Sequence, residues 1–308
     1  MRLAWVAVAA VVCYGVGRHV GRLWGELGEF RFHFSLRWCV VAGLSYGLGL
    51  SLCGSFWWLA LRDMGCRAGR ARTLAAYFVS QLGKYAPGKA WVVAIRCGMI
   101  AGPQANVLAT AASVFCETLM MMAVGAAVAL GIFLLVPTGQ RWTLCGIAAG
   151  LAFGLWVGLL PPVFARLAQV ATKPFRRAGQ PAPPPCSGRS LAKGVGLNLG
   201  AWALLGLSLF ATANAIRPAP LSLASWPLLT GTVALAIVGG FIIFFMPGGL
   251  GVREWVLMET LTPILGHEQA VLAALLLRFI WVLSEMCFAG ACYAGVRIWS
   301  HVAGKRSS

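Results

Sequence analysis

The sequence predicts an all-α fold, a polytopic bundle of transmembrane helices. Of the 308 residues, 59% are apolar and only 11% are charged, whereas about a quarter of the residues in a soluble domain are charged. The apolar residues form long unbroken runs instead of the roughly ten-residue alternating segments of a membrane β-barrel. Because a helix satisfies its backbone amides internally, it is the element that such runs form in a bilayer.

Seven apolar runs are predicted as full spans, and one more crossing within an interrupted segment would make eight. The seven runs are Leu3–Gly17, Trp38–Leu61, Val107–Val136, Trp142–Leu160, Val195–Ala213, Leu221–Met246 and Ala270–Val296. The first run has the length of a signal peptide, but its Ala-x-Ala pattern lies inside the run, so cleavage is the minor alternative. The stretch Gly21–Arg37 predicts an amphipathic helix in the membrane interface. Seven spans would put the termini on opposite sides of the membrane, and eight would put them on the same side.

A single transmembrane domain over residues 1–308 is predicted. It has a first half at 1–160, a linker at 161–193, a second half at 194–297 and a short basic tail at 298–308. Within the linker, Arg166–Lys193 holds five prolines and six basic residues but no acidic residue. This composition is typical of an exposed, poorly ordered loop, and the excess of Lys and Arg places the linker on the cytoplasmic side.

The charge pattern indicates contact with membrane lipids rather than with nucleic acid. The chain has 25 Lys and Arg against 8 Asp and Glu. These basic residues lie between apolar runs, where they face anionic headgroups. We interpret the cluster after the second run in this way, namely Arg62, Arg67, Arg70 and Arg72. The ten cysteines are scattered without a Cys-x-x-Cys pair, so we interpret them as small apolar residues and expect no disulfide framework or zinc site.

Patterns typical of soluble enzymes are missing, so we expect no enzymatic activity, no metal and no cofactor. Asp63 is the only aspartate, the four histidines are dispersed, and there is no phosphate-binding Gly-x-x-x-x-Gly-Lys loop. One Gly-x-Ser-x-Gly match, Gly43–Gly47, lies inside the second run. A nucleophile elbow needs a strand-to-helix turn, so we interpret these small residues as a helix-packing surface.

Two semi-apolar segments, Leu74–Ile100 and Met246–Pro263, are interrupted by proline and glycine. The first contains Lys84, Tyr85, Pro87, Gly88 and Lys89, and the second contains Pro247, Gly248 and Gly249. Each is followed by an arginine, Arg96 or Arg253. Broken segments at corresponding places in two halves indicate a transporter-type repeat, although two unrelated surface loops are the alternative. We expect two pseudo-repeated halves, each with a re-entrant segment that dips into the membrane.

Three charged residues lie within predicted spans. They are Glu117, Arg278 and Glu285. A charge at the centre of a membrane helix costs about 2.5 to 3.5 kcal/mol on insertion scales, and such residues usually line a pathway. We therefore expect all three to face the bundle interior or a shared cavity. Arg278 and Glu285 are seven residues apart and so lie on one helix face. The alternative is that these charges only pair helices together.

The two broken segments are also predicted to form a phosphate-binding site. Free N–H groups at the start of a broken helix and the positive end of its dipole bind anions, and arginine can bind phosphate through two hydrogen bonds. If the segments meet, they would surround one polar pocket with Lys84, Lys89, Arg96 and Arg253. Glu254 would then orient an arginine.

These motifs resemble the lysylphosphatidylglycerol synthase transmembrane-region family. The resemblance lies in Tyr77–Trp91 with Arg96 downstream, and in Met246–Glu254 followed by Arg278. The family includes the flippase portion of the multiple peptide resistance factor and hopanoid- and glycolipid-associated membrane proteins. The resemblance implies a multi-pass protein of the bacterial inner membrane that moves lipids between leaflets. It does not imply the synthase activity, which belongs to a separate soluble domain.

The resulting hypothesis is a lipid flippase or transporter-like protein of cell-envelope biogenesis. Its substrate would be an anionic phospholipid or a polyprenyl-phosphate-linked lipid. The alternative is a non-transporting membrane subunit that assists a separate glycosyltransferase or lipid-modifying enzyme. The scarcity of acidic residues argues against a third hypothesis, an integral membrane transferase.

Overall fold

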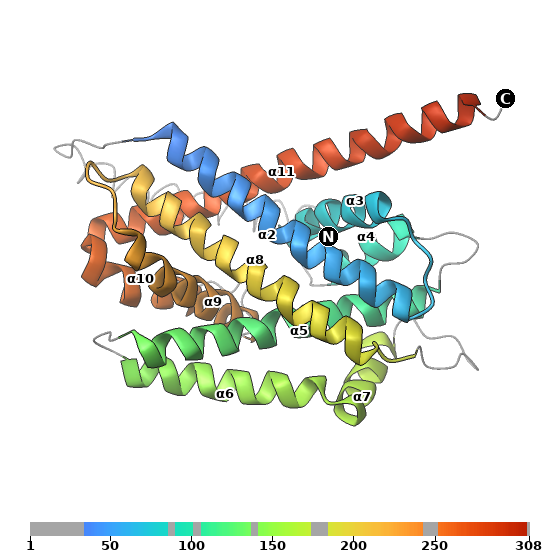
Figure 1. Cartoon of the computed structure of the whole chain (residues 1–308), viewed down its shortest axis with the longest axis horizontal. Helices are drawn as coiled ribbons and strands as arrows, with labels where there is room; N and C mark the ends of the chain where they lie inside the picture. The colour runs from blue at the N-terminus through green and yellow to red at the C-terminus, as the bar shows by residue number, and fades with distance from the viewer. Residues whose placement is uncertain are drawn as a thin grey trace, which may run out of the picture. The chain divides into compact units, whose positions relative to one another are not determined.

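The computed structural model describes residues 34–85, 90–100, 106–136, 141–173, 184–242 and 252–306. In these ranges the chain forms helices joined by turns, with no strand among the described residues (Figure 1). The predicted all-α class is therefore confirmed. The helices belong to one compact unit, Ser35–Ser308. The predicted span Leu3–Gly17 and nearly all of the predicted interfacial helix lie outside the described residues.

Six helices of the described ranges are long and apolar enough to cross a membrane. They are α2 (Leu36–Asp63), α5 (Val107–Leu135), α6 (Arg141–Leu159), α8 (Gly188–Ala215), α9 (Trp226–Ile242, preceded by the 3-10 turn η3, Leu223–Ser225) and α11 (His267–Arg306). Each covers one of the predicted runs. Large apolar side chains are exposed on one side of α2, at Val40, Leu44 and Leu48. Their spacing of four residues gives α2 one continuous exposed apolar stripe, as expected for a helix side that contacts lipid.

The predicted loop between the halves is shorter than its composition indicated. The helix α7 (Pro161–Thr172) occupies its beginning, and the first turns of α8 occupy its end. Proline at the first position of α7 favours a helix start, because that position needs no N–H donor. The Ser187 side chain caps α8 by accepting a hydrogen bond from the Ser190 backbone N–H at 3.2 Å. Local capping therefore extends helical structure into a segment rich in basic residues.

The helices α2 and α8 are antiparallel and lie side by side along their length (Figure 1). At one end, the Ser35 N–H donates to the Ala215 carbonyl at 2.9 Å. At the other, the Ser187 N–H donates to Asp63 Oδ2 at 2.8 Å. We call these the Ser35 end and the Asp63 end of the bundle. Small residues allow the close approach, since a Cβ on Gly194 would lie 2.4 Å from the Phe56 ring.

The first broken segment forms a hairpin with both outer ends at the Asp63 end. It consists of α3 (Arg70–Gln81), the 3-10 turn η1 (Leu82–Tyr85) and α4 (Ala90–Ile100). Arg72 Nε, at the start of α3, donates to the Met99 carbonyl near the end of α4 at 2.9 Å. The next helix, α5, begins at the same end, where the Asn106 side chain accepts a hydrogen bond from the Leu108 N–H at 2.9 Å. The predicted interruption is thus a hairpin, although residues 86–89 lie outside the described ranges.

The second broken segment forms a hairpin with both outer ends at the Ser35 end. The hairpin is longer than the predicted segment Met246–Pro263, because α10 (Val252–Leu265) packs against α9, which was predicted as a separate full span. Arg217 Nη1, just beyond the end of α8, donates to the Ile264 carbonyl near the end of α10 at 3.4 Å. Gly266 then turns the chain into α11 with a φ of +83°, a conformation that favours glycine. Residues 243–251, between α9 and α10, are outside the described ranges.

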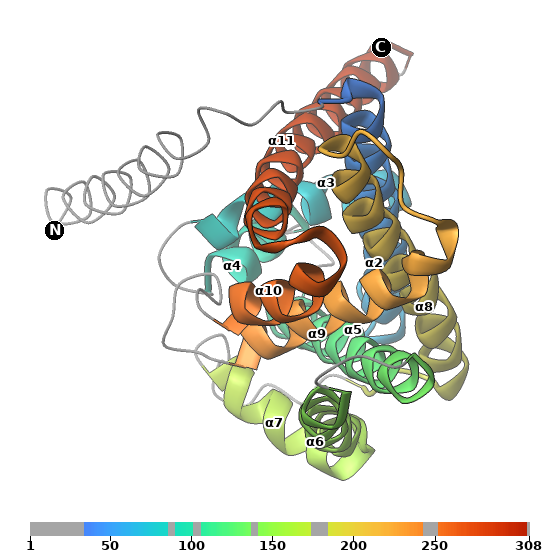
Figure 2. The same ribbon diagram turned by 90° about the vertical axis from the view of Figure 1, so that its left-hand side faces the viewer.

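The two halves therefore share one element order but run in opposite directions. Each has a long helix, a broken hairpin and a second long helix, and the hairpins start from opposite ends of the bundle. This arrangement favours an inverted repeat over two unrelated loops. Of the remaining helices, α6 packs on α5 and α7 packs on both, on the side away from α11 (Figure 2).

Candidate functional site

The inner ends of the two hairpins meet at α2 and α11. Lys84 of η1 forms an ion pair with Glu285 of α11, and the Tyr46 hydroxyl of α2 donates to the same Glu285 oxygen. Lys84 Nζ also lies 3.4 Å from the Tyr46 hydroxyl. Tyr46 stacks on Trp281 with ring centroids 4.5 Å apart, and the Arg253 guanidinium carbon of α10 lies 4.7 Å from the centroid of Trp281. We call these five residues the central site.

The two partners of the ion pair differ strongly in exposure. The Glu285 side chain is 0% exposed, whereas the Lys84 side chain is 38% exposed. A buried carboxylate needs charged or hydrogen-bonding partners to offset its lost hydration, and the Lys84 ammonium and the Tyr46 hydroxyl provide them. The Lys84 side chain is therefore partly accessible, while the carboxylate that binds its ammonium stays enclosed.

Arg278 lies two turns before Glu285 on α11, as predicted, but the two residues bind different hairpins. Arg278 forms an ion pair with Glu254 of α10, and both side chains are about one-third exposed. Arg278 is thus less enclosed than predicted, and the arginine that Glu254 pairs with is Arg278. The Arg278–Glu254 pair can be counted together with the central site. The positive charges are then those of Lys84, Arg253 and Arg278, and the negative charges are those of Glu254 and Glu285. This group has a net charge of +1.

Arg96 does not join the central site, so the single polar pocket predicted from the sequence is divided. Its Nη1 donates to Glu117 Oε2 at 2.8 Å, and its Nε donates to Ser80 Oγ at 2.9 Å. Arg96 and Glu117 are each only 2% exposed. The expectation that Glu117 faces the bundle interior is confirmed, but Arg96 is enclosed in an ion pair and cannot meet a lipid phosphate without breaking it.

Two aromatic rings complete the enclosure of Arg96. Its guanidinium carbon lies 4.6 Å from the Trp57 centroid and 4.3 Å from the Tyr77 centroid, distances at which a cation is attracted to a ring face. The Tyr77 hydroxyl donates to Glu117 Oε1 at 3.1 Å. This buried cluster links α2, α3, α4 and α5, so we assign it a structural role in holding the first hairpin.

Sequence reasoning missed the aromatic residues of both clusters. Tyr46 lies inside the Gly43–Gly47 stretch, where its position gave no sign of a polar role. Trp281 could have been found from its place one helical turn after Arg278, on the same side of the helix. Gly43 and Gly47 do allow close helix packing, as predicted, because their open faces lie against Ser284 and Phe288 of α11. Several predicted site residues lie outside the described residues, namely Pro87, Gly88, Lys89, Pro247, Gly248 and Gly249, and Tyr85 is described only as the last residue of η1.

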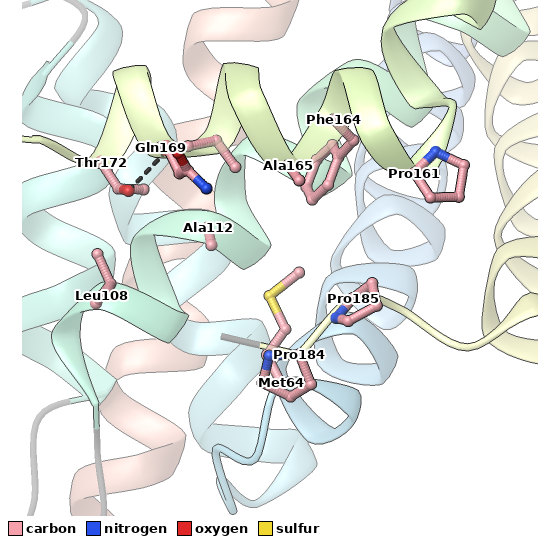
Figure 3. Close-up of a pocket in the computed structure, with 11 residues that line it drawn as sticks. Met64, Leu108, Ala112, Pro161, Phe164, Ala165, Gln169, Thr172, Pro184 and Pro185 are labelled. Atoms are coloured by element: carbon pink, nitrogen blue, oxygen red, sulfur yellow. Dashed lines mark hydrogen bonds between the residues drawn. The ribbon is translucent and has the colours of Figure 1, made fainter. Parts of the chain in front are cut away.

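A cavity of about 130 Å³ lies apart from both clusters. Figure 3 shows Phe164, Ala165 and Gln169 of α7 facing α5 and the Pro184–Pro185 stretch. Among the described residues that line this cavity, none is charged. The charged groups that suit an anionic ligand lie instead where the hairpins meet.

The bundle and its enclosed ion pairs define a multi-pass helical membrane protein with charged residues inside the bundle. A family model described as Lysylphosphatidylglycerol synthase TM region matches residues 3–286, and the chain belongs to this family. The match includes both hairpins and every residue of the central site. No curated protein matches the sequence significantly.

Proposed function

We propose that the protein moves a lipid with an anionic headgroup between the leaflets of a membrane during cell-envelope biogenesis. The substrate class would be an anionic phospholipid or a polyprenyl-phosphate-linked lipid, and the membrane would be a bacterial inner membrane. The observation that carries the proposal is that Lys84 and Arg253, from hairpins starting at opposite ends, reach one aromatic stack. Membership in a family of membrane lipid-related proteins supports it.

The charges of the residues where the two hairpins meet would suit the binding of one phosphodiester. The five described charged residues where the hairpins meet have a net charge of +1, which one phosphodiester would neutralise. Arg253 lies in the first turn of α10, where free backbone N–H groups and the helix dipole also favour an anion. The phosphate would contact the exposed Lys84 ammonium and the Arg253 guanidinium, and Glu285 would hold Lys84 in place when no lipid is bound.

The inverted hairpins suggest how such a site would be reached from both leaflets. Each hairpin would be a re-entrant segment, one dipping in from each side of the membrane, and the acyl tails would remain in the bilayer. Movement of one hairpin against the other would open the central site to one side at a time. No covalent step is needed, and the protein would act without a cofactor and without enzymatic activity.

Reconstitution tests this proposal directly. The purified protein would be placed in liposomes with fluorescent phosphatidylglycerol, and the outward movement of label would be followed by chemical quenching from outside. We expect the protein to accelerate this movement. Lys84→Met and Arg253→Met should each lower the acceleration at least tenfold, because each removes a cation but keeps an unbranched side chain. Arg67→Met, at an exposed basic residue beyond α2, is the matched control and should retain normal movement.

The same measurement separates the proposal from its alternative. A membrane subunit that only assists a separate glycosyltransferase or lipid-modifying enzyme would leave lipid movement at the rate of empty liposomes. Normal movement in both Lys84→Met and Arg253→Met would instead show that the central site does not bind the headgroup. A zwitterionic label, phosphatidylcholine, tests whether net negative charge is required.

A further inference from the structure

The thiols of Cys116 and Cys186 lie together although the residues are distant in sequence. Their Sγ atoms are 3.5 Å apart, and both cysteines are in the free form. Cys116 belongs to α5, and Cys186 belongs to the short stretch before α8. We propose that these two residues form a redox-sensitive pair whose reversible disulfide ties the start of α8 to α5. This proposal goes beyond the movement of lipids and does not depend on it.

The backbone next to Cys186 is anchored, so the thiol has a set position. The Ser187 N–H donates to Asp63 Oδ2 at 2.8 Å, and the Ser187 hydroxyl donates to the same oxygen at 2.9 Å. Ser187 is also the N-cap of α8. These contacts hold the residue after Cys186 against the end of α2, which keeps the Cys186 thiol beside α5.

The surroundings also leave room for the small shift that a bond requires. A disulfide needs its sulfur atoms about 2.0 Å apart, so the two thiols must approach further. The cavity of about 130 Å³ adjoins the pair, because Ala112, one turn before Cys116, and Pro185, next to Cys186, both line it (Figure 3). An adjoining space of this kind lets the Pro184–Cys186 stretch move toward α5 without displacing a helix.

The difference in exposure between the cysteines indicates the order of the reaction. Cys116 is 2% exposed, whereas Cys186 is partly exposed. Hydrogen peroxide would first oxidise the Cys186 thiolate to a sulfenic acid, taking up two electrons and releasing one water after protonation. The Cys116 thiol would then attack the Cys186 sulfur, forming the S–S bond and releasing a second water with its proton. A dithiol reductant reverses the reaction by thiol exchange.

The position of the Cys116–Cys186 pair at the Asp63 end indicates a disulfide that forms only under certain conditions. From the basic residues near the Asp63 end we expect this end to lie on the cytoplasmic side, where thiols are normally kept reduced. The bond would therefore form under oxidative conditions only. It would link α5, next to Glu117, with the stretch just before α8, and so join the two halves of the bundle covalently.

Peptide mapping of the full chain in lipid nanodiscs tests the pair. The protein would be treated with hydrogen peroxide, unfolded in denaturant so that buried thiols can react, blocked with N-ethylmaleimide, digested and analysed by mass spectrometry. We expect a peptide linked between Cys116 and Cys186, with the loss of two maleimide-reactive thiols and their full return after dithiothreitol. Cys186→Ser, a substitution of similar size at a partly exposed position, should abolish the linked peptide.

A matched control uses another partly exposed cysteine. Cys39→Ser, on α2, should leave the linked peptide at the wild-type amount. If Cys186 instead accumulates as sulfinic acid, or if both thiols remain reactive at peroxide doses that oxidise exposed Cys287, the pair does not form a disulfide and the proposal is wrong. Both readouts are independent of lipid movement, so they stand whether or not the proposed transport is observed.

Discussion

The rings of Tyr46 and Trp281 stack with their planes 12° apart, and this stack joins the two broken hairpins of the protein. On one side Tyr46 contacts Lys84 of the first hairpin, and on the other side Trp281 contacts Arg253 of the second. The stack itself comes from α2 and α11, so two long helices provide a fixed platform on which the hairpin residues meet.

The Tyr46 hydroxyl should stabilise the buried Glu285 carboxylate. Tyr46→Phe keeps the ring stack but removes one of the two described donors to Glu285, and a hydrogen bond to a charged group contributes about 1.5 to 3 kcal/mol. We expect a lower thermal unfolding midpoint for the detergent-purified variant. In a Glu285→Gln background the same change should cost less, because the charge that needs the donor is gone. Equal losses in both backgrounds would contradict the assignment.

The Arg96–Glu117 pair should be required for folding rather than for ligand binding. Breaking a buried ion pair by removing one partner costs about 3 to 5 kcal/mol, so Arg96→Leu and Glu117→Leu should each reduce the amount of folded protein in the membrane. The double variant should be less destabilised than the two single losses added together. The measurement is the folded yield by size-exclusion chromatography. Arg96→Leu with wild-type yield but no lipid movement would restore the ligand-binding role predicted from the sequence.

The glycine surface on α2 should set the distance to α11. A Cβ on Gly47 would lie 2.0 Å from Phe288 Cε2, and Phe288 is also stacked on Phe78 with centroids 5.2 Å apart. Gly47→Ala should therefore destabilise the fold by about 1 to 3 kcal/mol through overpacking. Gly196→Ala on α8 is the control, since nothing lies within 4 Å of its added Cβ. Thermal unfolding should separate the two, and equal midpoints would argue against the close contact.

The Asp63 end should face the cytoplasm. Cys186 alone is a poor reporter for this test, because it packs against Cys116. Gly188→Cys, exposed at the start of α8 with open space around it, is a better probe at that end. Ala224→Cys in η3 is the probe for the opposite end. In a Cys186→Ser, Cys287→Ser background, an impermeant maleimide should label only Ala224→Cys in intact cells. Labelling of only Gly188→Cys would reverse the assigned orientation.

The ion pair between α10 and α11 should contribute little to stability because it is partly exposed. Exposed pairs are typically worth less than 1 kcal/mol. Arg278→Glu should therefore lower the unfolding midpoint slightly through repulsion of Glu254, and the added Glu254→Arg exchange should restore it. The comparison of the single and double variants at low and high salt measures the effect. A large loss that the exchange does not restore would mean that Arg278 has a different partner.

Most of the helical organisation could be predicted from the sequence. The runs beginning at Trp38, Val107 and Trp142 correspond to α2, α5 and α6 within a few residues, because a membrane span is specified locally by its length and apolar content. The interruptions after Lys84 and Met246 were predicted for a similar reason, since proline and glycine disfavour a continuing helix wherever it packs. The helices at the two ends of the predicted linker, α7 and the first turns of α8, were not predicted, because the basic composition of this segment indicated a loop. The cap that Ser187 provides for α8 stabilises a helix there despite that composition.

The partners of the charged residues were decided only by the tertiary structure. Glu285 binds Lys84 across 201 positions of sequence, and Arg96 binds Glu117 across 21. The sequence by itself determined the all-α membrane fold and the burial of Glu117 and Glu285, because each depends on local apolarity and on the cost of placing a charge in an apolar helix. The opposite directions of the two halves and the separation of Arg96 from Lys84 depend on which helices pack together. That packing fixes which cation each buried carboxylate meets, since an ion pair forms only between groups brought within a few ångströms of each other.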